Sequence, residues 1–405
     1  MRGEGSIDDR PDQDLDMSAP LRVGVVGCGN VAVNFHLPAY RALPDRFELV
    51  GLADPTPERL ELGRVAAGLP ERLVHQDARD LLARDDIDLI DVCTPQHHRR
   101  DLLVAAAATG RHILCEKPIA AVPADAAAAV AAAEQARVTL AVVHNYLFFP
   151  EVVAASQVIA SGEIGQVRTV TVNMLGVLDA PGAAAYDPRW RHDPVAAGGG
   201  VLMDMLHAVY LAEHLLGAPA ERVSAYVDNA TDGDPVEGLA LCRLEADGRA
   251  ALVNVGWGLG PGGIQVSGTL GRLTIGYQDG GTCPWAPFER LTVTTGAATR
   301  VHPLPPGKEL VPLARDALHA TLLDVADAIG QGRAPMADGR QALHILEATV
   351  AAYGSAALGA TVALPLPAGG PLHRSGVVGL QELDVPEWSM VARRGLFGVG
   401  RRPPT

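Results

Sequence analysis

Short apolar runs alternate with helix-length segments through the first 145 residues of the chain. The runs with strand character cover residues 23–26, 47–54, 87–95, 112–118 and 138–146. Between the later runs lie two segments of helical pattern, of which the first is closed by Gly110 and the second is opened by Pro123. Strands that alternate with helices predict an α/β domain with a parallel, doubly wound sheet.

The pattern changes in the second half of the chain. Between residues 167 and 295, apolar and polar positions alternate in short runs that glycines separate, and the sequence EADGRAA at 245–251 carries an Asp-Gly hairpin signal. Residues 317–332 and 341–359 carry apolar stripes at helical spacing. This half therefore predicts an α+β domain built on a large, mainly antiparallel open sheet.

These changes of pattern divide the chain into four segments. We expect a disordered tail over 1–20, the α/β domain over 21–145, the α+β domain over 146–366 and a C-terminal extension over 367–405. The tail is rich in acidic residues and has little to bury. For the extension, a subunit-swapping arm, a lid and a loose tail all remain open.

Composition and charge exclude several classes of function. The net charge of −14 argues against a nucleic-acid partner, which requires a basic face. The chain has no run of the ~18 apolar residues that a membrane span needs, and its start lacks the basic and apolar regions of a signal peptide. Five cysteines without a CxxC pair favour reduced thiols. We therefore expect a cytoplasmic protein without a membrane partner.

The first strand-like run ends in a glycine-rich turn, Gly27-Cys28-Gly29-Asn30-Val31-Ala32. This is the GxGxxG pattern with alanine in the third place, in which the first glycine permits the turn and the second admits a pyrophosphate. Asp54 ends the second run and is placed to bind ribose hydroxyls, which favours NAD over NADP. The alternative for Asp54 is a turn residue before Pro55. The candidate cofactor residues in this region are Gly27, Gly29, Asn30, Val31 and Asp54.

Further polar residues stand where the later strands end. Ligands of doubly wound sheets bind beyond the carboxyl ends of the strands, so these positions are candidates for cofactor or substrate contacts. A histidine pair, His97-His98, follows directly after one such end, although an exposed helix start explains it equally well. The candidates are Thr94, Pro95, His98, Glu116, Lys117, His144, Asn145 and Tyr146.

At Glu116-Lys117-Pro118 the sequence resembles the Gfo/Idh/MocA oxidoreductases, the relatives of glucose–fructose oxidoreductase and inositol dehydrogenase. The resemblance covers about residues 21–366 and is carried, in order, by the glycine turn, CTP, EKP, HNYLFFPE, SGEIGQV, GGGVLMD and DGRQALHILEATVAAYGSAALGATVALP. It implies an NAD(P)-binding Rossmann domain and then a substrate-binding and oligomerisation domain. It also implies oxidation or reduction of a hydroxyl on a sugar, cyclitol or similar polyol.

The resemblance also assigns roles to single residues. Lys117 corresponds to the lysine that bridges the nicotinamide ribose and the substrate hydroxyl, and Pro118 to a proline whose peptide bond is often cis. An ammonium beside a hydroxyl stabilises the developing alkoxide. The alternative for Lys117 is a solvated loop lysine. Family members often pair their sheets face to face, so we expect a homodimer or homotetramer.

The segment GGGVLMDMLHAVYLAEHLLG, residues 198–217, contains Asp204 and His207. The resemblance implies an aspartate and a histidine four positions apart, whereas here they are three apart, and a bulge or a tightened turn can absorb the difference. We expect His207 to be the general acid/base and Asp204 to orient the substrate or the imidazole. The alternative is a core histidine. No third ligand stands at a recognisable spacing, so no metal is expected.

The loop before this segment offers Trp190 and Arg191 as substrate contacts, since a tryptophan face suits the C–H surface of a sugar. Alternatively, both side chains pin the loop to the sheet. His144 and Tyr146 are further substrate candidates. The leading hypothesis is an NAD-dependent oxidoreductase of a sugar, cyclitol or glycoside. A redox-neutral epimerase or glycoside-cleaving enzyme with recycled NAD, and a non-catalytic NAD-binding protein, are the alternatives.

Overall fold

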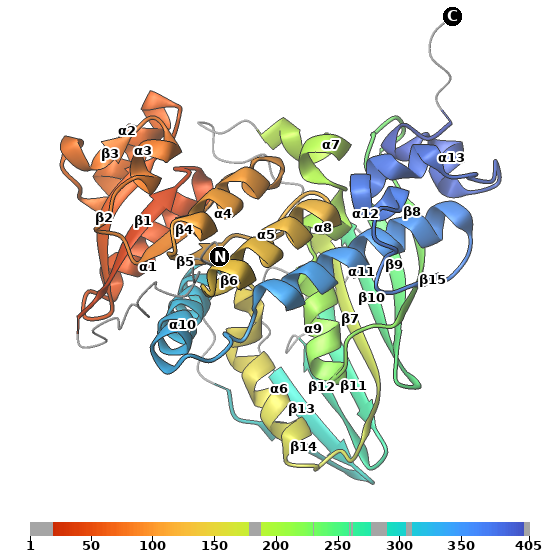
Figure 1. Ribbon diagram of the computed structural model, residues 1–405. Coiled ribbons are helices and arrows are strands. Elements are labelled where there is room, and N and C mark those ends of the chain that lie inside the picture. The colour runs from red at the N-terminus through yellow and green to blue at the C-terminus, as the bar shows by residue number, and fades with distance from the viewer. Residues whose placement is uncertain are drawn as a thin grey trace, which may run out of the picture.

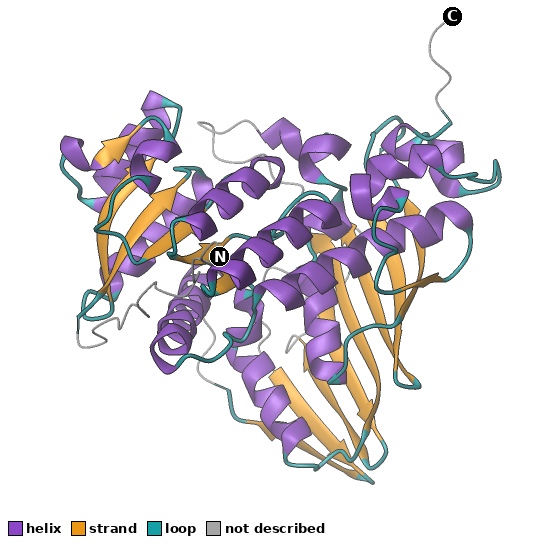
Figure 2. Cartoon of the chain, viewed as in Figure 1, coloured by secondary structure: helices purple, strands orange, loops and turns teal. Residues whose placement is uncertain are grey.

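The computed structural model describes residues 19–177, 188–229, 231–258, 260, 262–276, 290–304 and 310–400. Figure 2 shows two separate sheets, with helices packed between and beside them. The expected N-terminal tail, apart from its last two residues, lies outside the described chain.

The first sheet is the parallel sheet that the sequence predicts. Its order β3-β2-β1-β4-β5-β6 is that of a doubly wound nucleotide-binding fold. The strands are β1 Leu21–Val26, β2 Phe47–Ala53, β3 Val74–His75, β4 Leu89–Val92, β5 His112–Cys115 and β6 Leu140–Val142. β4 is buried along its whole length, which explains its continuous apolar character.

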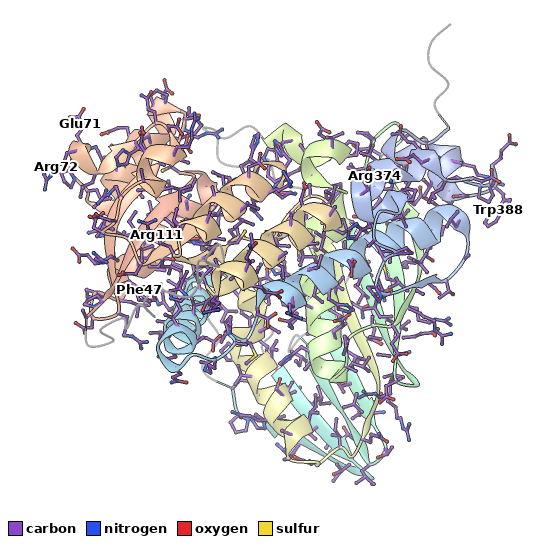
Figure 3. The ribbon with its side chains drawn as sticks, in the orientation of Figure 1. Phe47, Glu71, Arg72, Arg111, Arg374 and Trp388 are labelled. Carbon is purple, nitrogen blue, oxygen red and sulfur yellow. The ribbon has the colours of Figure 1, made fainter. Side chains whose placement is uncertain are left out.

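Helices connect these strands and cover both faces of the sheet (Figure 1). They are α1 Leu37–Ala42, α2 Pro57–Ala67, α3 Ala78–Leu82, α4 Arg99–Ala108 and α5 Pro123–Ala136. Short helical turns precede some of them: η1 Ala32–His36, η2 Glu71–Leu73, η3 Gln96–His98 and η4 Asn145–Phe148. In Figure 3, Glu71 and Arg72 of η2 lie at the outer edge of this domain.

The second sheet has nine strands in the order β14-β13-β12-β11-β7-β10-β9-β8-β15. All neighbours are antiparallel except β7 and β10, which pair in parallel, so the expected mainly antiparallel sheet is confirmed. The predicted hairpin at Asp247-Gly248 joins β9 to β10, and both turn residues have positive φ. The strands are β7 Val167–Val177, β8 Arg222–Asp228, β9 Leu239–Ala246, β10 Arg249–Trp257, β11 Gly262–Gly268, β12 Gly271–Gly276, β13 Arg290–Thr295, β14 Ala298–His302 and β15 Val362–Ala363.

Helices cover one face of this sheet. They are α6 Pro150–Ala160, α8 Val201–Asp204, α9 His207–Leu216 and α11 Gly339–Leu358. The remaining helical segments of this half are α7 Pro194–Ala197, α10 Leu310–Gln331 and the turn η5 Pro188–His192. α10 returns to the first domain, where Leu318 and Leu322 join the same apolar cluster as β1. The two domains therefore share a packed boundary instead of being joined by a single linker.

The C-terminal extension packs against preceding helices and strands of the same chain. It contains α12 Pro371–Ser375, η6 Gly376–Glu382, α13 Met390–Arg394 and η7 Leu396–Gly398, beside α11 and β8 (Figure 1). Phe397 is fully buried against Tyr353, with ring centroids 5.1 Å apart. Arg394 forms ion pairs with Asp228 and Asp232. Arg374 and Trp388 lie on its outer side (Figure 3). Residues 367–400 thus pack against the second domain through α11 and β8 and against α5 of the first domain through α12.

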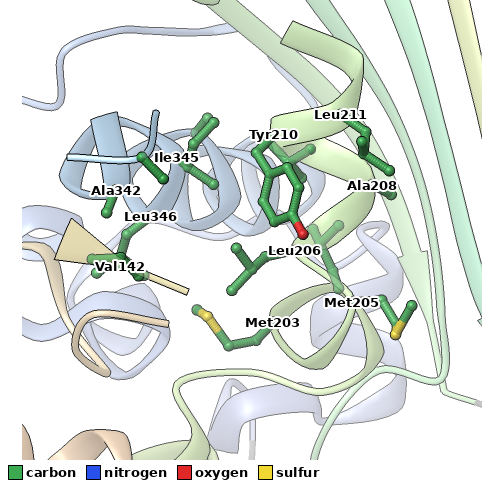
Figure 4. Packing of buried hydrophobic residues seen from close by; sticks show 14 of the residues in the cluster. Val142, Met203, Met205, Leu206, Ala208, Tyr210, Leu211, Ala342, Ile345 and Leu346 are labelled. Carbon is green, nitrogen blue, oxygen red and sulfur yellow. The ribbon is translucent and has the colours of Figure 1, made fainter. Parts of the chain in front are cut away.

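The segment 198–217 is not one helix. α8 ends at Asp204 and α9 begins at His207, and the axes bend by 47° between them. Figure 4 shows Met205 and Leu206 at this bend, inside the apolar core. In the described chain no single helix qualifies as a membrane span by length and hydropathy, although the bent pair Pro194–Asp204 and His207–Leu216 does so when taken together.

Candidate functional site

A cavity of about 780 Å³ runs along the carboxyl ends of the first sheet and reaches α8 and β10 of the second domain. Its lining includes most of the residues predicted from the sequence: Gly27, Gly29, Asn30, Val31, Asp54, Thr94, Pro95, His98, Glu116, Lys117, Trp190, Arg191 and Asp204. The fold therefore gathers residues separated by up to 177 positions around one space.

The glycine turn forms one end of this cavity. Gly27 has a φ of +97°, and a Cβ there would meet the carbonyl carbon of Cys93 at 2.9 Å. A Cβ on Gly29 would meet nothing within 4 Å. The first glycine is therefore required by its backbone and by packing, whereas the second leaves an open cradle for a ligand.

Asp54 is fixed at the end of β2. Its carboxylate accepts hydrogen bonds from the backbone N–H groups of Cys28 and Thr56, both at 2.8 Å. Each carboxylate oxygen keeps a further lone pair, and the side chain borders the cavity. This position suits the recognition of ribose hydroxyls.

Lys117 stands after β5, where its peptide bond to Pro118 is cis. The turn is held from behind by Arg99, which donates hydrogen bonds to the main-chain carbonyls of Glu116 and Pro118 and, at 2.8 Å, to that of Thr94. Nothing in the sequence singled out Arg99. One buried guanidinium thus ties together the two strand ends that face the middle of the cavity.

The bend between α8 and α9 exposes a carbonyl that Lys117 uses. In a continuous helix the carbonyl of Asp204 would accept the N–H of Ala208, but that N–H bonds to Met205 at 2.9 Å instead. The freed carbonyl of Asp204 accepts the Lys117 ammonium at 2.6 Å, and its carboxylate Oδ1 lies 3.6 Å from the same nitrogen. The shortened spacing between Asp204 and His207 is therefore absorbed by a helix break that joins the two domains.

His207 lies behind the cavity wall and is 5% exposed. Its ring stacks on Tyr146 at 4.0 Å, and its Nδ1 is 2.7 Å from the hydroxyl of Tyr210. His144 stacks on the Tyr210 ring, with ring centroids 4.2 Å apart. Burial lowers the pKa of His207 well below its ordinary value, and the charge of Lys117 and the neighbouring His144 lower it further. These effects favour the neutral imidazole.

A buried carboxylate docks the start of α8. Glu237 accepts hydrogen bonds from the N–H groups of Gly200 and Leu202, both at 2.8 Å, and from the Tyr353 hydroxyl at 2.9 Å. Burial raises the pKa of Glu237 to about 7. No local motif marks Glu237, because its partners are 35 or more positions away in the sequence.

A second buried network lies under Glu116. His36 places Nδ1 2.7 Å from Asp91 and Nε2 3.0 Å from Glu116, and the Tyr40 hydroxyl donates to Asp91. Burial opposes protonation of His36, but Asp91 raises the pKa of the imidazole well above its ordinary value. Ligand atoms of His36, Asp91 and Cys93 lie within 4.8 Å of one another, a spacing that could hold a metal ion. Both ring nitrogens of His36 already have carboxylate partners.

Four sequence-predicted residues do not line the cavity: Asn145, His144, Tyr146 and His207. After β6 the chain turns at once into η4, which packs against α9 and α10, so these residues form a layer behind Lys117. By contrast, Trp257 at the end of β10 does line the cavity, beside Trp190 and Arg191, and was not expected. Nothing near Trp257 in the sequence indicates that its side chain lines the cavity.

Comparison with known proteins identifies both domains. Residues 21–144 match the model of an oxidoreductase family with an NAD-binding Rossmann fold, and residues 152–274 match the GFO/IDH/MocA C-terminal domain. D-apiose dehydrogenase of Paraburkholderia graminis is 28% identical over 347 residues, which are 84% of this chain and 88% of that protein. Levoglucosan dehydrogenase of Pseudarthrobacter phenanthrenivorans is 29% identical over 255 residues, 60% of this chain and 61% of that protein.

A solved structure gives the same answer. The aldose–aldose oxidoreductase from Caulobacter crescentus, complexed with glycerol, superposes with a TM-score of 0.72 at 26% identity, over 85% of this chain and 100% of that one. Together the two family models match more than half of the chain. The chain is a member of the Gfo/Idh/MocA family of NAD-binding oxidoreductases.

Proposed function

We propose that this protein transfers a hydride between NAD and a hydroxyl-bearing carbon of a sugar, cyclitol or glycoside. One observation carries the proposal. The ammonium of Lys117 is fixed on the carbonyl of Asp204 at 2.6 Å, beside the cavity that also contains the glycine turn and Asp54. The named activities of the apiose and levoglucosan dehydrogenases support the substrate class.

The cavity residues fit an NAD molecule. Gly29 leaves space for a pyrophosphate, Asp54 presents a carboxylate to the ribose, and the buried Thr94 hydroxyl has no hydrogen-bond partner among the described residues. NAD supplies the nicotinamide carbon that accepts or returns the hydride. Because the Asp54 carboxylate repels a 2′-phosphate, NAD is preferred over NADP.

Lys117 and Asp204 act on the substrate. The ammonium of Lys117 stabilises negative charge on the reacting oxygen, and the partly exposed carboxylate of Asp204 accepts a hydrogen bond from a neighbouring hydroxyl. Trp190 and Arg191, with Trp257 beside them, border the substrate end of the cavity. Their aromatic and cationic groups suit the C–H and hydroxyl surfaces of a sugar.

We also propose a cytoplasmic homodimer or homotetramer. Tyr226, Leu241 and Leu252 point outward from β8, β9 and β10 and are 39–45% exposed, which leaves an apolar area on the uncovered face of the second sheet. The four described cysteines are free thiols, which agrees with a reducing compartment. Sedimentation of the purified protein tests the oligomeric state.

A cofactor-reduction screen tests the main proposal. Purified protein is mixed with NAD, or separately with NADP, and a panel of sugars, cyclitols and glycosides, and the absorbance of reduced nicotinamide is followed. Lys117→Met should lower kcat at least about 10²-fold. Arg340→Met, which replaces a side chain 76% exposed on α11, is the matched control and should behave as wild type. Equal rates for Lys117→Met and wild type would overturn the proposal.

The likeness to an aldose–aldose oxidoreductase favours one further candidate, in which NAD stays bound and is recycled between two substrates. In that case the screen gives no net reduction, while NAD remains with the protein through purification. Chromatography of the sugar products, with pairs of aldoses supplied together, then distinguishes this reaction from simple oxidation.

A further inference from the structure

Tyr210 connects the backbone of η4 to the side chain of His207. Its hydroxyl oxygen accepts the N–H of Tyr146 at 3.1 Å and lies 2.7 Å from Nδ1 of His207. The Tyr210 side chain is fully buried. In Figure 4 it projects from α9 toward the bend that contains Leu206.

The hydroxyl proton of Tyr210 has one acceptor in the described chain. A phenol oxygen has two lone pairs and one proton, and the N–H of Tyr146 occupies one lone pair. If Nδ1 of His207 carried a proton, it would occupy the second lone pair and leave the buried Tyr210 O–H without an acceptor. Leaving a buried donor without a partner lowers the population of that arrangement about tenfold or more. The proton of Tyr210 therefore points to Nδ1, which must be unprotonated.

An unprotonated Nδ1 places the proton of neutral His207 on Nε2. Within the described chain Nε2 has no hydrogen-bond partner. Nor is it one of the fully enclosed polar atoms without a partner, so it keeps some exposure. Of the two ring nitrogens it is therefore the one left to bond a ligand, although His207 itself is not part of the cavity lining. His207 presents a donor there, and a nitrogen that already carries a proton cannot accept another.

We propose that Tyr210 is a positioning residue that holds His207 as its Nε2–H tautomer, so that His207 donates a hydrogen bond to the reacting oxygen while Lys117 carries the hydroxyl proton. The inference rests on the proposed oxidoreductase function. It differs from the acid/base role that the sequence alone assigns to His207. The position of Lys117 agrees with it, because an imidazolium would be repelled by the Lys117 ammonium.

The step balances with Lys117 as the carrier. During oxidation the carbinol C–H bond breaks and its electron pair leaves with the hydride. The O–H bond breaks, its electrons form the C=O bond, and the proton joins the free amine of Lys117 to give the ammonium. His207 keeps its Nε2 proton throughout and stabilises the negative charge on the oxygen. During reduction the Lys117 ammonium returns the proton.

The tautomer is measurable without substrate or cofactor. Protein labelled with ¹⁵N in its histidines gives long-range ¹H–¹⁵N spectra that distinguish Nε2–H from Nδ1–H, and the His207 signals are those lost in His207→Gln. At pH 7 we expect the Nε2–H pattern. Tyr210→Phe should convert it to a tautomer mixture. Tyr353→Phe, which also removes a buried hydroxyl but does not contact His207, is the matched control and should leave the pattern unchanged.

Activity gives an independent test. The amide N–H of glutamine can replace the Nε2–H donor but cannot act as a base at neutral pH. His207→Gln should therefore keep kcat within about tenfold of wild type, whereas His207→Ala should lose about 10²-fold. Circular dichroism confirms that both variants fold.

Different results would overturn different claims. An Nδ1–H or doubly protonated His207 in the wild-type spectra, or a folded His207→Gln as inactive as His207→Ala, would overturn the donor role. Full activity in Lys117→Met would instead overturn the proposed function, whatever the tautomer. If His207→Gln did not fold, the signals lost in His207→Ala would identify His207, and the wild-type, Tyr210→Phe and Tyr353→Phe spectra would still decide the tautomer.

Discussion

Two glycine-rich turns border the cavity, and they use glycine for opposite reasons. In the turn after β1, a Cβ on Gly29 would meet nothing within 4 Å. In the turn before α8, a Cβ on Gly199 would lie 2.2 Å from the Tyr353 hydroxyl, and one on Gly200 would lie 2.1 Å from the Glu237 carbonyl. The first turn leaves space at its second glycine, whereas the second turn has its space filled by the protein itself.

The difference assigns a task to each turn. The empty turn can receive a pyrophosphate against its backbone. The filled turn lets Glu237 and Tyr353 approach closely enough to bond the first N–H groups of α8. Those bonds fix the helix whose last residue, Asp204, holds Lys117. One turn therefore serves the cofactor directly, and the other serves the substrate end through packing.

The largest effect on stability should come from adding a side chain to the turn before α8, where the space is already occupied. In Gly200→Ala the new methyl group meets a backbone carbonyl, which cannot rotate away, so we expect a loss of about 3 kcal/mol in the free energy of unfolding. Chemical denaturation measures it. Gly276→Ala, at a glycine with open space and ordinary φ, is the control and should be close to wild type. A Gly200→Ala protein as stable as this control would show that the contact relaxes freely.

The filled turn should also make stability depend on pH. The pKa of Glu237 is raised to about 7 in the folded protein, so the folded state binds more protons than the unfolded state between pH 4.5 and 7. Stability is then greatest below this window and falls as pH rises through it, by up to about 3 kcal/mol. Urea unfolding of wild type and Glu237→Gln at pH 5 and pH 7.5 checks this. The difference in unfolding free energy between the two pH values should be smaller in Glu237→Gln than in wild type. An unchanged difference would exclude Glu237 as its cause.

The contrast between the turns also explains what the sequence could predict. The empty turn follows a local rule, because strand, glycines and Asp54 stand in fixed order along the chain. The parallel sheet, the hairpin at Asp247-Gly248 and the strand-end positions of Thr94 and Lys117 follow similar local rules. All of them could be predicted because each depends on neighbours in the sequence.

The filled turn depends on partners far away in the chain. Glu237 and Tyr353 meet the start of α8 only after the second sheet and α11 have folded, and Phe397 of the C-terminal extension packs on Tyr353. No sequence motif indicates these contacts. The helix break after Asp204 is of the same kind. The three-residue spacing between Asp204 and His207 indicated an irregularity in this helix. The exposed carbonyl that Lys117 binds, however, appears only when the two domains pack together.

The smallest change in stability, and the most selective change in function, should come from the empty turn. Gly29 has an ordinary φ and free space, so Gly29→Ala should unfold within about 0.5 kcal/mol of wild type. Its methyl group would occupy the space that a pyrophosphate needs, and NAD affinity measured by calorimetry should fall about 10- to 100-fold. Gly276→Ala again serves as control, because its methyl group is equally unobstructed but Gly276 does not line the cavity. Unchanged NAD affinity in Gly29→Ala would mean that the open space beside this turn is not where the cofactor lies, and the contrast between the two turns would then lose its functional meaning.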